Sequence, residues 1–92
     1  MAEISSGRPY VDEGELRTFS TNVLDTELVW HRDKEHRKIT VLEGEGWQLQ
    51  FNGNLPFELK YDHKFEIPQG MYHRIIKGKT DLVLKIEKDE KL

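Results

Sequence analysis

Histidine is the residue type in this chain that is best suited to chemistry. The four histidines are His31, His36, His63 and His73. An imidazole binds divalent transition metals and also carries protons near neutral pH. His31 is followed two positions later by the carboxylate of Asp33, whereas His73 ends the run of residues 67–73. Cysteine is absent, so neither thiolate chemistry nor disulfides can contribute.

The stretch that begins at His31 has a distinctive spacing. One residue separates His31 from Asp33, three residues separate Asp33 from Arg37, and six residues separate Arg37 from Gly44. This spacing resembles the first motif of the cupin family, in which the corresponding positions are His, His, Glu and Gly. Gly44 matches that motif in identity, while Asp33 and Arg37 replace its second His and its Glu.

A second stretch resembles the other cupin motif, which centres on Pro-x-Gly-x-x-His. Pro68, Gly70 and His73 match it in identity and spacing. The resemblance covers about residues 25–77 and implies a small all-β fold, an antiparallel β-barrel or double-stranded β-helix of the cupin jelly-roll kind. Three flanking positions depart from the family pattern, and they are Asp25, Asp62 and Lys77.

The resemblance also implies a metal site. The usual cupin ligands are three His and one Glu inside the barrel, and carrying these over leaves His31 and His73 in place. Asp33 becomes an oxygen ligand, in the His-x-Asp order also found in the facial triad of non-heme iron oxygenases. The implied cofactor is a divalent transition metal, namely Fe, Mn, Ni or Zn.

Arg37 is the main departure from the cupin ligand set, because its guanidinium stays protonated and cannot bind a metal ion. In one interpretation, Arg37 stands beside a three-ligand metal and binds an anionic group of a substrate. In the other, Asp33 and Arg37 form an internal ion pair that replaces the metal. The sequence leaves both interpretations open.

The two interpretations of Arg37 allow three classes of protein. The first class is a metal-dependent cupin enzyme of the dioxygenase or isomerase type that acts on a small anionic molecule. The second is a non-catalytic module that binds such a molecule. The third is a metal-free structural or interaction protein with the Asp33–Arg37 pair inside.

Other candidate residues have weaker support. His36 has the opposite strand parity to Arg37, so we expect it to point away, unless a bulge turns it inward as a substitute ligand. His63 lies in a turn and is expected to be solvated. Trp47 and Phe51 alternate with polar residues, which favours the core, and with Arg37 they are the candidates for contacting a substrate.

Short alternating strands must position these residues. Apolar side chains recur with period two between residues 39 and 86, and turn signals interrupt them every eight to twelve residues. The pair Asn52-Gly53 between two alternating runs is a strong hairpin signal. We expect an irregular arm over residues 1–14 with one short strand around Tyr10-Val11, one β domain over residues 15–88 with fraying beyond Ile86, and a charged tail over residues 89–92.

Composition limits the partners. The net charge is −3, and acids and bases are mixed along all 92 residues, so no basic stripe for nucleic acid is present. No apolar stretch approaches a membrane span of about 20 residues. We therefore expect a soluble, cytoplasmic protein that binds neither nucleic acid nor membrane. Its small core and the cupin resemblance favour a homodimer.

Overall fold

The computed structural model describes residues 9–89 of the chain. These residues contain eight strands and one short 3-10 helix, η1 (Asp25–Glu27). The strands are β1 (Val11–Glu13), β2 (Leu16–Phe19), β3 (His36–Glu43), β4 (Gln48–Phe51), β5 (Phe57–Glu58), β6 (Lys64–Ile67), β7 (His73–Ile76) and β8 (Leu82–Asp89).

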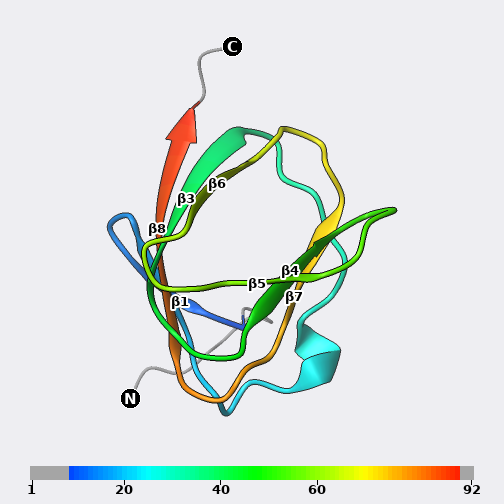
Figure 1. Ribbon diagram of the computed structural model, residues 1–92. Helices are drawn as coiled ribbons and strands as arrows, with labels where there is room; N and C mark the ends of the chain where they lie inside the picture. The colour runs from blue at the N-terminus through cyan, green and yellow to red at the C-terminus, as the bar shows by residue number, and fades with distance from the viewer. Residues whose placement is uncertain (1–8, 90–92) are drawn as a thin grey trace.

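The strands form two antiparallel sheets. The larger sheet has the order β1-β2-β8-β3-β6, and the smaller sheet has the order β5-β4-β7. Figure 1 shows the two sheets on opposite sides of the molecule. The predicted all-β antiparallel fold is confirmed, but the sheets are not closed into a barrel. The architecture is therefore an open sandwich of two facing sheets.

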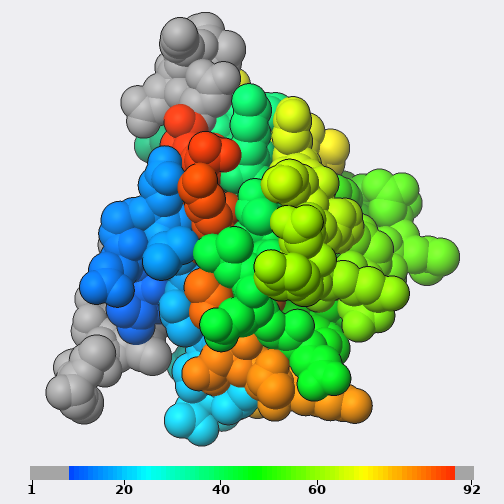
Figure 2. Space-filling model, turned by 60° about the vertical axis from the view of Figure 1, so that its left-hand side comes forward, coloured from blue at the N-terminus to red at the C-terminus, as the bar shows by residue number. Residues whose placement is uncertain are grey.

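The larger sheet is built on the pairing of β3 with β8. Ile39 lies opposite Ile86, and Val41 lies opposite Leu84. All four side chains are buried, whereas the neighbour Lys38 is exposed, as the period of two requires for a sheet with one solvated face. Figure 2 shows the solvent-facing side, where the β1–β2 hairpin, β8, β3 and β6 follow one another across the surface.

The core between the sheets is small and apolar. Its fully or nearly buried members come from most of the strands and from the connecting loops. They are Phe19, Val23, Ile39, Val41, Trp47, Leu49, Leu59, Ile67, Leu82, Leu84 and Ile86. The alternating residues of the sequence therefore form one shared interior, as predicted.

The larger sheet extends beyond the predicted β domain at both ends. Within the expected arm, where a short strand was indicated around Tyr10-Val11, β1 pairs with β2 as a hairpin and joins the large sheet, with Gly14 in the turn. Fraying after Ile86 was expected, but β8 continues to Asp89, and Lys88 lies opposite Arg37. Residues 1–8 of the arm and residues 90–92 of the tail lie outside the described residues.

Gly44 follows a bulge in the β3–β8 pairing, at a position that does not accommodate a side chain. Its φ is +136°, a conformation that is costly for residues with a Cβ. A Cβ added there would lie 2.7 Å from Leu82 Cδ1 and 3.2 Å from Leu82 Cα. Because one of these atoms belongs to the backbone, a side-chain rotation cannot relieve the whole clash.

We expect Gly44→Ala to lower the free energy of unfolding by about 2–4 kcal/mol, from backbone strain and overpacking together. Gly53→Ala is the matched control, because Gly53 also has a positive φ, of +85°, but no heavy atom lies within 4 Å of its Cβ position. Its loss should be about 1 kcal/mol. Urea unfolding of both variants measures the difference, and equal losses would contradict the packing argument.

Candidate metal centre

His31 and His73 are joined through their backbones. The His31 N–H donates to the His73 carbonyl at 2.9 Å, and the His73 N–H donates to the His31 carbonyl at 2.9 Å. Residues paired in this antiparallel way project their side chains to the same face. The two imidazole rings accordingly lie with their centroids 4.3 Å apart. A loop residue is thus held beside β7 as if it belonged to the smaller sheet.

Both rings are oriented by the same kind of hydrogen bond. Nδ1 of His31 lies 3.0 Å from the Val29 carbonyl, and Nδ1 of His73 lies 2.8 Å from the Met71 carbonyl. A carbonyl oxygen only accepts, so Nδ1 carries the proton in each ring. In a neutral imidazole, Nε2 then keeps a free lone pair, as a metal-binding histidine requires.

Asp33 completes the cluster. Its Oδ1 lies 3.9 Å from His31 Nε2, and its Oδ2 lies 3.6 Å from His73 Nε2. One ligand atom from each of the three residues lies within 4.8 Å of the other two. The backbone of Asp33 is fixed as well, because its carbonyl accepts a hydrogen bond of 3.0 Å from the Gly70 N–H.

The cluster consists of acceptors without a donor of its own. Oδ2 of Asp33 is buried and has no hydrogen-bond partner among residues 9–89. Burial, the largest influence, lowers the pKa of His73, which favours the neutral ring with its lone pair. Two ligands at about 2.0–2.2 Å from one ion are at most about 4.4 Å apart, so an ion can bridge Asp33 to either histidine. The donor set therefore fits a divalent transition metal.

Arg37 lies beside the cluster but is held mainly by another residue. Its Nη1 is 3.5 Å from Asp33 Oδ2, without a hydrogen bond. Its Nε and Nη2 both donate to Glu35 Oε2, at 3.1 and 2.8 Å. The hydrogen bond from Arg37 also lowers the pKa of Glu35. The Asp33–Arg37 ion pair, one of the two interpretations left open by the sequence, is therefore present as a contact of 3.5 Å, while Glu35, which was not among the candidates, is the main partner of Arg37.

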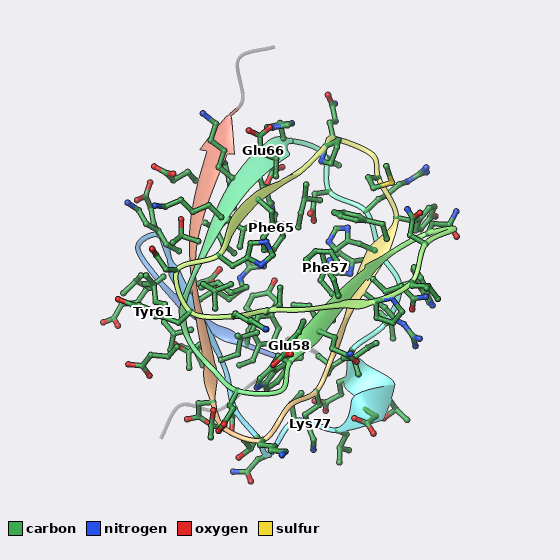
Figure 3. The ribbon with its side chains drawn as sticks, viewed as in Figure 1. Phe57, Glu58, Tyr61, Phe65, Glu66 and Lys77 are labelled. Carbon is green, nitrogen blue, oxygen red and sulfur yellow. The ribbon has the colours of Figure 1, made fainter. Side chains whose placement is uncertain are left out.

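His36 and His63 lie outside the cluster. His36 projects from β3 to an exposed carboxylate, with Nε2 2.8 Å from Glu66 Oε1, so the prediction that it points away from the Arg37 face is confirmed. His63 was expected to be solvated, but it is half-buried against Phe57 and Phe65. The rings of Phe57 and Phe65 meet edge to face 5.5 Å apart in the interior (Figure 3).

Lys77, one of the departures from the cupin pattern, fixes the loop before His31. Its ammonium donates to the carbonyls of Thr21, at 3.1 Å, and Val23, at 2.9 Å. Figure 3 shows Lys77 at the end of the molecule where the η1 loop lies. The lysine therefore ties the end of β7 to the segment that leads to the cluster.

A cavity of about 240 Å³ opens beside the cluster. His31, Asp33, Arg37 and His73 all line it. The two remaining candidates, Trp47 and Phe51, do not line the cavity. Trp47 is fully buried, and its indole N–H donates to the Thr80 carbonyl, so it is part of the core.

Phe51, the remaining candidate, packs behind the site. Its ring lies 6.0 Å from Phe57 and 6.4 Å from the edge-on ring of His73, between centroids. Phe51 therefore contacts the His73 ring but does not itself line the cavity. The structure thus brings four of the six predicted site residues to the cavity wall.

Comparison with known proteins gives the fold. No protein-family model matches the chain, and no curated protein matches it. A cupin-2 domain containing protein from Shewanella frigidimarina NCIMB 400 has a similar structure, with a TM-score of 0.55, 21% identity, and coverage of 86% of this chain and 76% of that one. Protein NMB1881 from Neisseria meningitidis is also similar, with a TM-score of 0.54, 13% identity, and coverage of 87% of this chain and 80% of that one.

At these identities the likeness concerns the fold alone. The chain has a cupin-type fold, as the two sequence motifs implied. Among residues 9–89, no helix is long and apolar enough to cross a membrane.

The electrostatics of the cluster predict an unequal cost for two isosteric changes in metal-free protein. Glu35→Gln should lower the free energy of unfolding by about 1–3 kcal/mol, because Arg37 loses both charged hydrogen bonds. Asp33→Asn should change it by less than about 1 kcal/mol or raise it, because the amide can donate to the facing lone pairs. Urea unfolding in the presence of a chelator measures both. A larger loss for Asp33→Asn would contradict this account.

Proposed function

We propose that this protein is a metal-dependent cupin that binds a small anionic molecule at the His31–Asp33–His73 cluster. The observation that carries the proposal is the convergence of three acceptor atoms without a donor, one of them the buried Asp33 Oδ2. A buried carboxylate oxygen without a partner is costly, and a divalent cation would satisfy it together with the histidine lone pairs once the ligand atoms, now up to 4.8 Å apart, draw together by a few tenths of an ångström.

The donor set indicates which metals to consider. Two imidazoles and one carboxylate suit Fe(II), Mn(II), Ni(II) and Zn(II), and three protein ligands leave positions open for a bound molecule. When bound, such an ion polarises an oxygen of its ligand as a Lewis acid. The chain supports either an enzyme of the dioxygenase or isomerase type or a non-catalytic binding protein.

Arg37 supplies the second part of the proposal. Its side chain is only 12% exposed, and within residues 9–89 its Nη1 makes no hydrogen bond. The guanidinium therefore has a donor free for an oxygen of a ligand that also touches the ion. Glu35 holds the other edge of the guanidinium and fixes its orientation.

A metal-free function is the second candidate. The contact of 3.5 Å between Arg37 Nη1 and Asp33 Oδ2 favours it, because the arginine partly compensates the carboxylate without any ion. In that case the protein is a binding or structural module with a cupin fold. Homodimer formation and a cytoplasmic location stay predictions from the sequence.

Metal binding separates the two candidates. We expect protein purified without chelator, or reconstituted with Zn(II) or Fe(II), to hold about one ion per chain, measured by elemental analysis and titration calorimetry. His31→Ala and His73→Ala should each weaken binding at least about tenfold, since even indirect partners of metal ligands matter that much. Far-UV circular dichroism checks that the variants fold.

His36→Ala is the matched control, because His36 is a histidine of the same domain that binds Glu66 instead of facing the cluster. It should keep full metal affinity. Absence of metal after reconstitution would leave the metal-free candidate, and an equal loss in His36→Ala would mean that the metal binds elsewhere.

A further inference from the structure

The walls of the cavity are mainly apolar. Side chains from both sheets line it, among them Ile39, Leu49, Phe65, Ile67, Ile75 and Leu84. Hydroxyl or phosphate groups placed against such walls would lose their hydrogen bonds to water without replacement, at a cost of several kcal/mol each. The part of a ligand that fills this space is therefore hydrocarbon, which argues against sugars and sugar phosphates.

Polar groups for recognition are concentrated at the cluster. Apart from the cluster and Arg37, the charged side chains that line the cavity, within the part of the chain that the structure describes, are Arg17 and Glu27. Arg17 is already held by Asp12, with bonds of 2.7 and 3.0 Å, and stacks on Tyr10 at 3.7 Å. Glu27 would repel an anion. A second acidic group on the ligand therefore finds no available cation.

The charges beside the cluster also limit the ligand. Asp33 is negative and Arg37 is positive, and Glu35, which holds Arg37, is paired in turn with Lys88 Nζ at 3.8 Å, so these four groups are neutral together. A divalent ion adds two positive charges, which an anionic ligand offsets in part. Because net charge is costly in a largely apolar cavity and no cation is available for a second acidic group, the ligand should be a monoanion and should bind only with the metal present.

Volume sets the size of the hydrocarbon. A cavity of about 150 Å³ with apolar walls holds a benzene molecule. The cavity here, of about 240 Å³, has room for a ring or branched chain together with a short acid group, on the order of ten non-hydrogen atoms.

We infer that the ligand of this site is a small monocarboxylic acid with an aryl or branched-alkyl body, its carboxylate between the metal ion and Arg37 and its body between the two sheets. This inference rests on the proposed metal site and adds the substrate class.

The test uses phenylacetate with the full-length, zinc-loaded protein, followed by titration calorimetry. Phenylacetamide has the same shape without the charge, and acetate has the charge without the ring. We expect phenylacetate to bind at least about tenfold more tightly than either, the equivalent of one 1.4 kcal/mol step. Chelator-treated protein should lose this binding.

Two variants test the assigned contacts. Arg37→Gln should weaken phenylacetate binding at least about tenfold, whereas Arg32→Gln, which removes an arginine that stacks on the exposed ring of Tyr72, should leave it unchanged. Ile75→Phe should fill part of the cavity and reduce phenylacetate binding while zinc affinity stays the same.

The failures are distinguishable. If zinc binds at the cluster but phenylacetate binds no better than acetate or phenylacetamide, the inference is wrong and the metal site stands. Equal phenylacetate affinity with and without zinc would overturn the charge argument. If zinc does not bind, the proposed function fails and the inference fails with it.

Discussion

The paired backbone hydrogen bonds between His31 and His73 are the constraint on which the site depends. Side-chain chemistry requires atoms placed within tenths of an ångström, and a loop residue rarely has that precision. Here two hydrogen bonds make His31 an extra member of the smaller sheet, and the bond from Gly70 to the Asp33 carbonyl fixes the next ligand. Lys77 holds the start of the same loop, so the ligand-bearing segment is anchored at several points.

Much of the fold was predictable because it follows from local rules. Alternation of apolar residues sets the inner faces of β3 and β8, and the Asn52-Gly53 turn joins β4 to β5 in an antiparallel pair. The two edges of the domain were not predictable in the same way. The β1–β2 hairpin is short and partly exposed, and the last residues of β8 are charged, so both are ordered by neighbouring strands rather than by their own composition.

The site was predictable in its members but not in its pairings. Motif spacing alone indicated that His31, Asp33 and His73 converge, which they do. It could not show that Arg37 turns to Glu35, because two acceptors, Asp33 and Glu35, both lie within reach just before β3, and only the packed structure decides between them. The period of two did place Glu35 and Arg37 on one side, so this signal was present. Alternation favoured the core for Trp47, where it lies, but could not by itself remove Trp47 from the candidates for ligand contact, because the pattern is the same whether an aromatic side chain faces a cavity or a solid core.

The position of β8 in the larger sheet has a consequence for how the protein is made. β8 comes last of the strands in sequence, yet it lies between β2 and β3 and pairs with both. As the ribosome releases the chain from its N-terminal side, the hairpin and β3 have no common partner until residues 82–89 emerge. The larger sheet, and with it one wall of the cavity, must therefore assemble late and through contacts distant in sequence, which is characteristic of slow folding. Until then, the apolar faces of the earlier strands are available to chaperones and to aggregation.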